Sequence, residues 1–370
     1  MKIYQVGGAV RDKLLGINPQ DVDYVVVGAT IEKMLSLGYL QVGKNFPVFI
    51  NPQTKEEYAL ARKEIKIGDK HTDFKFIFTP DITLKEDLQR RDFTCNALAY
   101  DETTNELIDY NHGQEAIEKK ILRHVNAKHF VEDPLRVLRM CRFSAQLDFD
   151  IDEETISLTK KMVQEGMLEN LSAERIWKET EKALQSQHFY KFIEAAKKCN
   201  ALSYLFPEIS ENSFKFFSKA ENFSAKIKFA LFLSVAKDEY EVKNICNRLK
   251  VPNLYKNFAT MSFKYQNKID ELIKADLPDL IDFIDSITKG KSFDDMEEIF
   301  DVFSIKKAHP LIDVKSGLKS FKGYIRRIYN ILSSIKASDM SNFESLKNSK
   351  ELKDLYRLYR IQKVEKYLEK

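Results

Sequence analysis

Two aspartates, Asp21 and Asp23, stand immediately before the run Tyr24–Val27. That run is aromatic and β-branched, which predicts a buried strand, and residues two apart along a strand point to the same side of a sheet. Both carboxylates therefore emerge together, and they repel each other unless a cation lies between them. Because Mg²⁺ is held by one or two carboxylates together with substrate phosphates, this pair is a candidate catalytic metal site. Taken alone, the pair also fits a solvated turn before a strand.

A glycine pair, Gly7 and Gly8, lies between a predicted strand at residues 1–6 and a predicted helix start. In this arrangement bare backbone N–H groups and the positive end of a helix can meet a phosphate, although a plain turn has the same pattern. Arg11, one turn into the helix, adds a forked donor for phosphate oxygens. The glycine turn therefore predicts a phosphate site beside the aspartates, with Gly8 and Arg11 as nucleotide-binding residues.

The order of these motifs resembles the polymerase-β nucleotidyltransferase superfamily. Residues 6–12, Val-Gly-Gly-Ala-Val-Arg-Asp, are similar to the class II tRNA nucleotidyltransferases (CCA-adding enzymes) of the bacterial type and to the related poly(A) polymerases. Three later stretches, at residues 86–99, 132–139 and 171–179, follow in that family's order and approximate spacing. The resemblance is strong over residues 1 to about 185, weaker to about 335 and not evident in the last stretch.

Arg91 and Arg139 are further candidates for binding the nucleotide. Arg91 precedes the apolar run 93–97, which must hold it against the core, and an arginine so placed suits a triphosphate or a ribose. A salt bridge at the end of a surface helix is the alternative interpretation. The resemblance implies that Arg91 touches the incoming nucleotide. Asp92 and Asn96 are expected to support the site or to lie on the sugar side. Arg139 is expected to reach the triphosphate from a later helix.

Asp133 and Arg136 lie three residues apart on one face of a predicted helix, with Asp133 as its N-cap and Pro134 at its first position. An Asp acceptor beside an Arg donor complements the exocyclic amino group and ring nitrogen that cytosine and adenine share. Uracil and guanine present a carbonyl and an N–H instead, so both contacts would fail. The pair predicts selection of C and A without a nucleic-acid template, and the resemblance implies the family's templating residues at these positions.

Length and glycine placement predict an α/β head followed by helices. Eight of the 12 glycines fall at or before Gly113, and glycine-rich turns belong with tightly connected strands. At 370 residues the chain is too long for one core. The predicted fold is an α/β nucleotidyltransferase head with a small mixed sheet and helices (residues 1–125), followed by an all-α neck with the nucleotide-selecting motif (126–185), an all-α body (186–305) and a tRNA-binding all-α tail (306–370).

Local patterns predict the elements of the head and neck. Strands are expected at residues 21–28, 40–42, 48–51, 58–62 and 96–100, with a helix at 31–37. Residues 64–80 lack a clean periodicity, which predicts a mobile loop or loose hairpin near the site, with His71 as a loop histidine. Ser172 is expected to cap a helix whose Trp177 faces the core.

The net charge is +3 at pH 7, so any nucleic-acid contact must come from local clusters of charge. One such cluster is a basic helical surface, for which tRNA phosphate contact is favoured over a plain solvated face: Lys315, Lys319, Lys322, Arg326, Arg327 and Lys336. The four cysteines lack zinc-ligand spacing and are expected to be buried thiols. No apolar run approaches the roughly 20 residues that span a bilayer, and no signal peptide is evident, so a cytoplasmic protein is expected.

The predicted reaction is template-independent addition or repair of the 3′-terminal CCA of tRNA from CTP and ATP, with release of pyrophosphate. Asp21 and Asp23 would hold Mg²⁺ in a two-metal arrangement, and Glu57 is the candidate for a third carboxylate. The predicted partners are tRNA, CTP and ATP, with no membrane and no protein partner implied. The alternatives are a poly(A) polymerase, a CC-adding or A-adding variant, and an RNA-binding protein that has lost its metal carboxylates.

Overall fold

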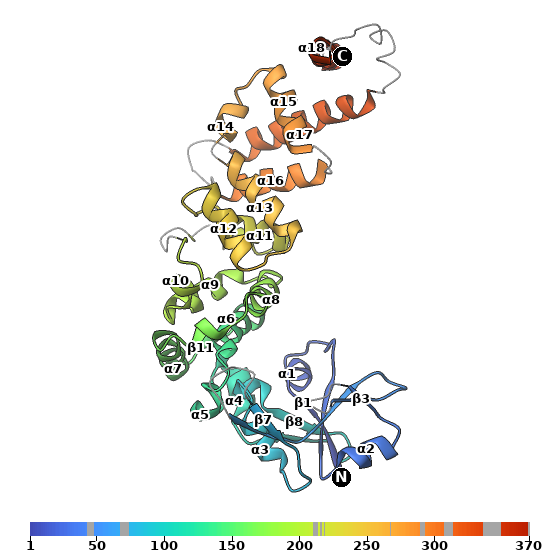
Figure 1. Ribbon diagram of the computed structural model, residues 1–370, viewed down its shortest axis with the longest axis vertical. Helices are drawn as coiled ribbons and strands as arrows, with labels where there is room; N and C mark the ends of the chain where they lie inside the picture. Colours follow the sequence, from blue (N-terminus) through green and yellow to red (C-terminus); the bar gives the residue numbers. More distant parts are fainter. Residues whose placement is uncertain are drawn as a thin grey trace. The chain divides into compact units, whose positions relative to one another are not determined.

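The computed structural model describes residues 1–42, 48–66, 74–209, 214, 217, 219–266, 268–288, 293–306, 314–335 and 349–368. These residues form two compact units, Met1–Pro207 and Glu208–Lys370. The first unit contains the predicted head and neck and the first residues of the predicted body. Figure 1 shows the sheet of this unit near the N-terminus, followed along the chain by helices.

The first unit is built on a mixed seven-stranded sheet with the strand order β3-β4-β5-β2-β1-β8-β9. The strands are β1 (Lys2–Val6), β2 (Asp23–Val27), β3 (Leu40–Val42), β4 (Val48–Ile50), β5 (Glu57–Leu60), β8 (Leu98–Asp101) and β9 (Glu106–Asp109). Neighbouring strands are antiparallel except β2 and β5, which run parallel. The α/β head with a small mixed sheet is therefore confirmed.

Side chains alternate between the two faces of the sheet along β2, and this alternation determines the face on which Asp23 lies. Tyr24 and Val26 pack with Met34 of α2 (Ile31–Ser36) on one face, whereas Val25 packs with Leu88 of α3 (Leu84–Gln89) on the other. Asp23 is two residues before Val25 and so shares the α3 face. The chain that follows α3 begins with Arg90 and Arg91, and Asp23 therefore faces these two arginines.

Shorter elements and helices complete the first unit. They are α1 (Gly8–Leu14), β6 (Lys63–Lys66), β7 (Phe74–Ile77), the 3-10 turn η1 (Thr94–Asn96), α4 (Gly113–Glu118), β10 (Ile121–Leu122), α5 (Ala127–Phe130), α6 (Leu135–Leu147), β11 (Asp150–Ile151), α7 (Glu153–Gln164), the 3-10 turn η2 (Met167–Asn170), α8 (Ala173–Leu184), α9 (Phe189–Lys198) and α10 (Ala201–Leu205). β6 and β7 pair in antiparallel fashion, which agrees with the loose-hairpin interpretation of residues 64–80, and the residues that connect them lie outside the described part. His71 lies outside the described residues.

A buried ion pair with α8 fixes the orientation of helix α6 about its own axis. Arg142 of α6 donates to Glu179 of α8 over 2.5 Å, and both side chains are buried. Val137, Leu138 and Cys141 form the buried side of α6. Because residues three apart share a helix face, this rotation leaves Arg136 and Arg139 together on another side.

The second unit is mainly helical in its described residues, with one isolated antiparallel bridge between Ile209 and Ala236. Its helices are α11 (Ala225–Leu233), α12 (Glu239–Arg248), α13 (Asn253–Tyr265), α14 (Ile269–Leu272), α15 (Leu277–Thr288), α16 (Phe293–Lys306), α17 (Val314–Ser334) and α18 (Ser349–Leu368). Phenylalanines fill its core, among them Phe229, Phe232, Phe300 and Phe303, none of which is more than 2% exposed. Among the residues that the structure describes, no helix combines the length and the apolar character needed to cross a membrane.

Most predicted boundaries shift by one or two residues. β2 begins at Asp23 rather than at residue 21, and β8 begins at Leu98 rather than at residue 96, because residues 94–96 form the turn η1. Ser172 caps α8, as predicted, by accepting from the backbone N–H of Arg175, and Trp177 is buried. All four cysteines are free and buried, as expected.

Candidate active site

A cavity of about 640 Å³ opens on the α3 face of the sheet. We name it the arginine cavity after the arginines that line it: Arg11, Arg62, Arg90, Arg91, Arg136, Arg139 and Arg175. Gly8, Asp23 and Asp133 also line it, so the structure brings every predicted site residue except Asp21 to one cavity. Asp21 lines an adjoining cavity of about 570 Å³, which we name the carboxylate cavity after Asp21, Asp23, Glu56 and Glu57.

Asp23 and Glu57 line both cavities. They are register partners at the starts of the parallel strands β2 and β5, so their side chains leave the sheet on the same face. Partial burial raises the pKa of the Asp23 carboxyl above its ordinary value, the positive charge of Arg91 lowers it, and the negative charge of Asp21 adds to the increase. The carboxylates of Asp21 and Asp23, which repel each other beside an arginine-lined cavity, are chemically suited to a hard divalent cation.

The carboxylates do not form a complete protein cage for a metal. Within the described residues, no group of three or more His, Cys, Asp or Glu side chains is arranged to hold a metal ion. A two-carboxylate site nevertheless fits Mg²⁺, which is usually bound through one or two carboxylates, waters and substrate phosphates. The donor set present therefore fits a metal that is shared with a phosphate-bearing substrate.

Gly7 and Arg91 fit closely against each other. Gly7 has a φ of +76°, and a Cβ at this position would lie 2.9 Å from Nη1 of Arg91. Arg91 is further held by Asp87, which is fully buried and accepts from Nη2 of Arg91 over 3.4 Å and from Nη2 of Arg90 over 2.7 Å. The Nε of Arg91 is buried and has no hydrogen-bond partner within the described chain. The Arg91 guanidinium is thus fixed between the glycine turn and Asp23 with a donor left over.

Arg11 is held by Asp12 and by Asn96 of the η1 turn. Its Nε and Nη2 donate to Asp12 over 2.8 and 2.6 Å, and its Nη1 donates to Asn96 over 2.5 Å. Its guanidinium also lies 5.4 Å from the ring centre of Phe143 in α6. Asn96 joins Arg11 to Asp92, because its Oδ1 accepts from Nη1 of Arg11 and its Nδ2 donates to Oδ1 of Asp92.

Asp92 is the buried anchor of Arg139. Its Oδ2 accepts from Nε and Nη2 of Arg139 over 2.8 and 2.5 Å, and its Oδ1 accepts from the backbone N–H of Phe93 and from Asn96. Burial opposes ionisation of Asp92, but the charge and hydrogen bonds of Arg139 outweigh burial and lower the pKa of Asp92 to about 2. Asp92 is therefore ionised at neutral pH and fixes the guanidinium of Arg139, whose side chain is one-third exposed and lines the arginine cavity.

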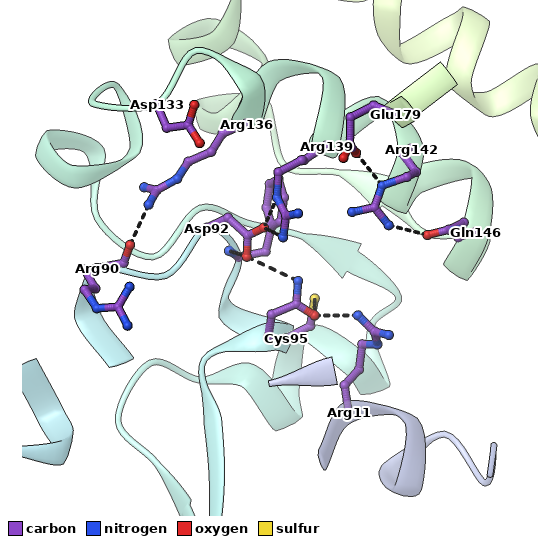
Figure 2. A network of polar contacts seen from close by, with 12 residues as sticks. Arg11, Arg90, Asp92, Cys95, Asp133, Arg136, Arg139, Arg142, Gln146 and Glu179 are labelled. Carbon is purple, nitrogen blue, oxygen red and sulfur yellow. Dashed lines mark hydrogen bonds and ion pairs between the residues drawn. The ribbon is translucent and has the colours of Figure 1, made fainter. Parts of the chain in front are cut away.

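Asp133 and Arg136 have separate partners. The Oδ1 and Oδ2 atoms of Asp133 accept from Nη2 of Arg175 over 3.2 and 3.4 Å. Arg136 donates from Nη1 to the backbone oxygen of His129 over 2.6 Å and from Nη2 to that of Arg90 over 2.7 Å. Figure 2 shows Arg136 reaching past Asp133 to Arg90. Both side chains stay at the wall of the arginine cavity.

The predicted cap of this helix needs one correction. α6 begins at Leu135 with Pro134 in the N-cap position, one residue later than predicted. The Oδ1 of Asp133 accepts from the N–H of Leu135 over 3.1 Å, which is the contact that a capping side chain ordinarily makes two residues on. Asp133 still supports the helix start, but from one position further back.

Sequence reasoning missed three residues that build the site. Arg175 was considered only as part of a helix start, Asp87 was not singled out, and Arg62 was treated as the end of a strand. Arg175 sits three residues after the cap Ser172, and its meeting with Asp133 spans 42 residues of sequence. No spacing rule along the chain predicts that contact; the only signal was an arginine in a stretch that resembles the family.

Comparisons with known proteins find related sequences and related folds. Residues 3–123 match the poly(A) polymerase head domain, and residues 148–212 match a domain described as the probable RNA and SrmB-binding site of polymerase A. The CCA-adding enzyme of Hamiltonella defensa subsp. Acyrthosiphon pisum (strain 5AT) is 41% identical, and the match covers 78% of this chain and 80% of that enzyme.

Solved structures that resemble nearly the whole chain include the following two. The apo form I of a CCA-adding enzyme has a TM-score of 0.71 at 26% identity, covering 98% of this chain and 86% of the other. The Thermotoga maritima CCA-adding enzyme complexed with tRNA has a TM-score of 0.70 at 25% identity, covering 98% of this chain and 87% of the other.

Proposed function

The chain belongs to the family of CCA-adding enzymes, and we propose that its two cavities carry out that family's reaction: template-independent addition or repair of the 3′-terminal CCA of tRNA from CTP and ATP. The protein is accordingly a tRNA nucleotidyltransferase. The observation that carries the proposal is the meeting, in the arginine cavity, of Asp23, fixed arginines and the Asp133–Arg136 pair.

Asp21 and Asp23 are the proposed metal ligands, with Glu57 as an additional carboxylate on the neighbouring strand. Enzymes of this family use divalent metal ions, and we propose Mg²⁺ because the ligands are carboxylates that leave positions for phosphate oxygens. When bound, such ions lower the pKa of the attacking hydroxyl and neutralise charge on the departing pyrophosphate. The raised pKa of Asp23 supports this assignment, since a nearby cation would relieve the cost of ionising it.

Arg91, Arg11 and Arg139 are proposed to bind the triphosphate, together with the backbone at Gly8. Each guanidinium is already fixed by a partner on its far side: Asp87 holds Arg91, Asp12 and Asn96 hold Arg11, and Asp92 holds Arg139. Arginines held in this way lose little side-chain entropy when an anion arrives. They would orient the α-phosphorus toward Asp23, where the 3′ oxygen of tRNA attacks it and the bond to the departing pyrophosphate breaks.

Asp133 and Arg136 are proposed to read the base. The carboxylate accepts from the exocyclic amino group, and the guanidinium donates to the adjacent ring nitrogen, a pattern that cytosine and adenine share. With uracil or guanine, a carbonyl would face the carboxylate and an N–H would face the guanidinium. Two failed polar contacts in a partly desolvated site reject the wrong base by several orders of magnitude.

The path of tRNA over the second unit is a further part of the proposal. We assign phosphate contact to the basic surface of α17, where Arg326 and Arg327 are exposed and Arg326 is also paired with Glu297. The side chains of Lys315, Lys319 and Lys322, as well as residue Lys336, lie outside the described part. Because its substrate is tRNA, we place the enzyme in the cytoplasm.

The test is extension of a tRNA transcript that lacks CCA, with CTP alone, ATP alone, both, and UTP or GTP as controls. Growth by three nucleotides with CTP and ATP together is the expected result. A stop after two C residues, or addition of A alone to a transcript ending in CC, would identify a partial-adding variant. A long A ladder on arbitrary RNA would identify a poly(A) polymerase, and no extension with Mg²⁺ would contradict the proposal. The 41% identical relative is a CCA-adding enzyme, which favours the first outcome over the poly(A) reaction.

A further inference from the structure

The proposed base-reading residues, Asp133 and Arg136, do not pair with each other within the described part of the chain, although their charges and spacing favour pairing. Asp133 and Arg136 are oppositely charged and three residues apart at a helix start, a spacing at which such side chains ordinarily pair. If they paired, the carboxylate acceptor of Asp133 and a guanidinium donor of Arg136 would bind each other, and neither would be available to the base. Among the described contacts no hydrogen bond or ion pair joins the two side chains, and each is held by a partner from another segment.

Arg175 of α8 is the partner that holds Asp133. A single nitrogen, Nη2, bridges both carboxylate oxygens over 3.2 and 3.4 Å. Oδ1 also accepts from the backbone N–H of Leu135 over 3.1 Å, so it carries two donors, whereas Oδ2 carries only the longer contact to Arg175. A carboxylate oxygen can accept two hydrogen bonds, so Oδ2 keeps an acceptor position. Arg175 itself lines the arginine cavity, so this arrangement lies where the base must bind.

We propose that Arg175 is a specificity-determining positioning residue: it prevents Asp133 from pairing with Arg136 and keeps Oδ2 of Asp133 directed at the amino group of cytosine or adenine. The proposal rests on the base-reading role given above to Asp133 and Arg136. Arg136 is restrained separately, because its Nη1 and Nη2 atoms donate to the backbone oxygens of His129 and Arg90. When Arg175 is removed, Arg136 is still held by these backbone oxygens. The carboxylate of Asp133 is then the group that can rotate toward Arg136.

The pair of Arg175 with Asp133 contributes little to the stability of the fold. The two side chains are 30% and 31% exposed, and ion pairs of this exposure are screened by solvent. If the pair had only a structural role, breaking it would therefore change neither the stability of the fold nor the base preference by much. Loss of base discrimination, by contrast, is expected to be large, because it depends on the direction of one oxygen atom.

The experiment compares Arg175→Met with the wild type in single-nucleotide addition, measuring CTP against UTP on one transcript and ATP against GTP on a transcript ending in CC. Arg175→Met is expected to lower the preference for the correct base about tenfold or more, the loss that follows from one hydrogen bond to a charged group. The loss should appear in kcat/KM for CTP and ATP, with KM for tRNA unchanged. Arg175→Lys should restore most of the preference, since an ammonium can still hold the carboxylate.

Arg123→Met is the matched control. Arg123 forms a comparable ion pair with Asp152 over 2.9 Å in the same unit, and neither residue lines the arginine cavity. This variant should keep the wild-type preference. Thermal unfolding of all three variants, followed by the fluorescence of Trp177, should give midpoints close to that of the wild type.

A double-mutant comparison separates positioning from general damage. In an Arg136→Met background Asp133 has no Arg136 to turn toward, so adding Arg175→Met should change the remaining preference by less than about threefold. An equal loss in both backgrounds would overturn the proposal, as would a wild-type preference in Arg175→Met. Failure of the wild-type protein to extend tRNA would instead contradict the proposed function itself, so the two failures are distinguishable.

Discussion

The substitution Asp92→Asn tests whether a buried charge organises the nucleotide site. Asp92 is 7% exposed and accepts four hydrogen bonds, two of them from Arg139. Asparagine has nearly the same shape but no charge, and its amide must either turn N–H groups toward Arg139 or give up its contacts with Phe93 and Asn96. The variant therefore removes the ion pair with little change in volume.

The magnitude follows from the pKa of Asp92. Burial opposes ionisation, but Arg139 outweighs it and the pKa falls from the ordinary 3.8 to about 2. One pKa unit corresponds to about 1.4 kcal/mol, so the ionised group stabilises the folded state by about 2 kcal/mol. Because the folded pKa is the lower one, this contribution is fully present above about pH 4 and is lost progressively as the pH falls to about 2.

Urea unfolding followed by tryptophan fluorescence is a suitable assay, because Trp177 is the one tryptophan and is buried in the first unit. Between pH 7 and pH 3 the wild type should lose about 1 kcal/mol more unfolding free energy than Asp92→Asn, since about half of the Asp92 contribution has titrated by pH 3. Titration of other carboxylates affects both proteins alike and cancels in the comparison. Equal acid losses in the two proteins would refute the assignment of the charge to Asp92.

Three further substitutions probe the other parts of the site. Asp133→Ala should leave metal binding unchanged and lower the preference for C and A over U and G about 100-fold in single-nucleotide addition; an unchanged preference would contradict the base-reading role. Gly7→Ala should destabilise the first unit by about 1–2 kcal/mol in urea unfolding, because its φ is +76°, and should raise KM for CTP by moving Arg91. Asp23→Asn should reduce kcat about 1,000-fold or more, and retained turnover would exclude Asp23 as a metal ligand. Because the pKa of Asp23 is raised, protons compete with the metal, and isothermal titration should show wild-type metal affinity falling as pH falls.

The sequence by itself determined the parts of this protein that depend on neighbouring residues. The Tyr24–Val27 strand, the turn at Gly7 and the cap at Ser172 depend on local preferences, and the structure contains all three. Spacing along one element also determined that Asp133 and Arg136 lie together at the start of one helix. The family resemblance supplied the expected role of each motif.

Only the tertiary structure decided which motifs meet and how each side chain is held. The register of β2 with β5 brings Glu57 beside Asp23, and it depends on a parallel pairing across 34 residues that no local pattern encodes. The contacts of Asp92 with Arg139 and of Asp133 with Arg175 likewise join segments that are 47 and 42 residues apart. Such contacts arise from the packing of the whole unit, because a charged side chain takes whichever opposite charge the fold brings near. For that reason the sequence could predict that Asp133 and Arg136 would be neighbours, but not that each would be held by a different partner.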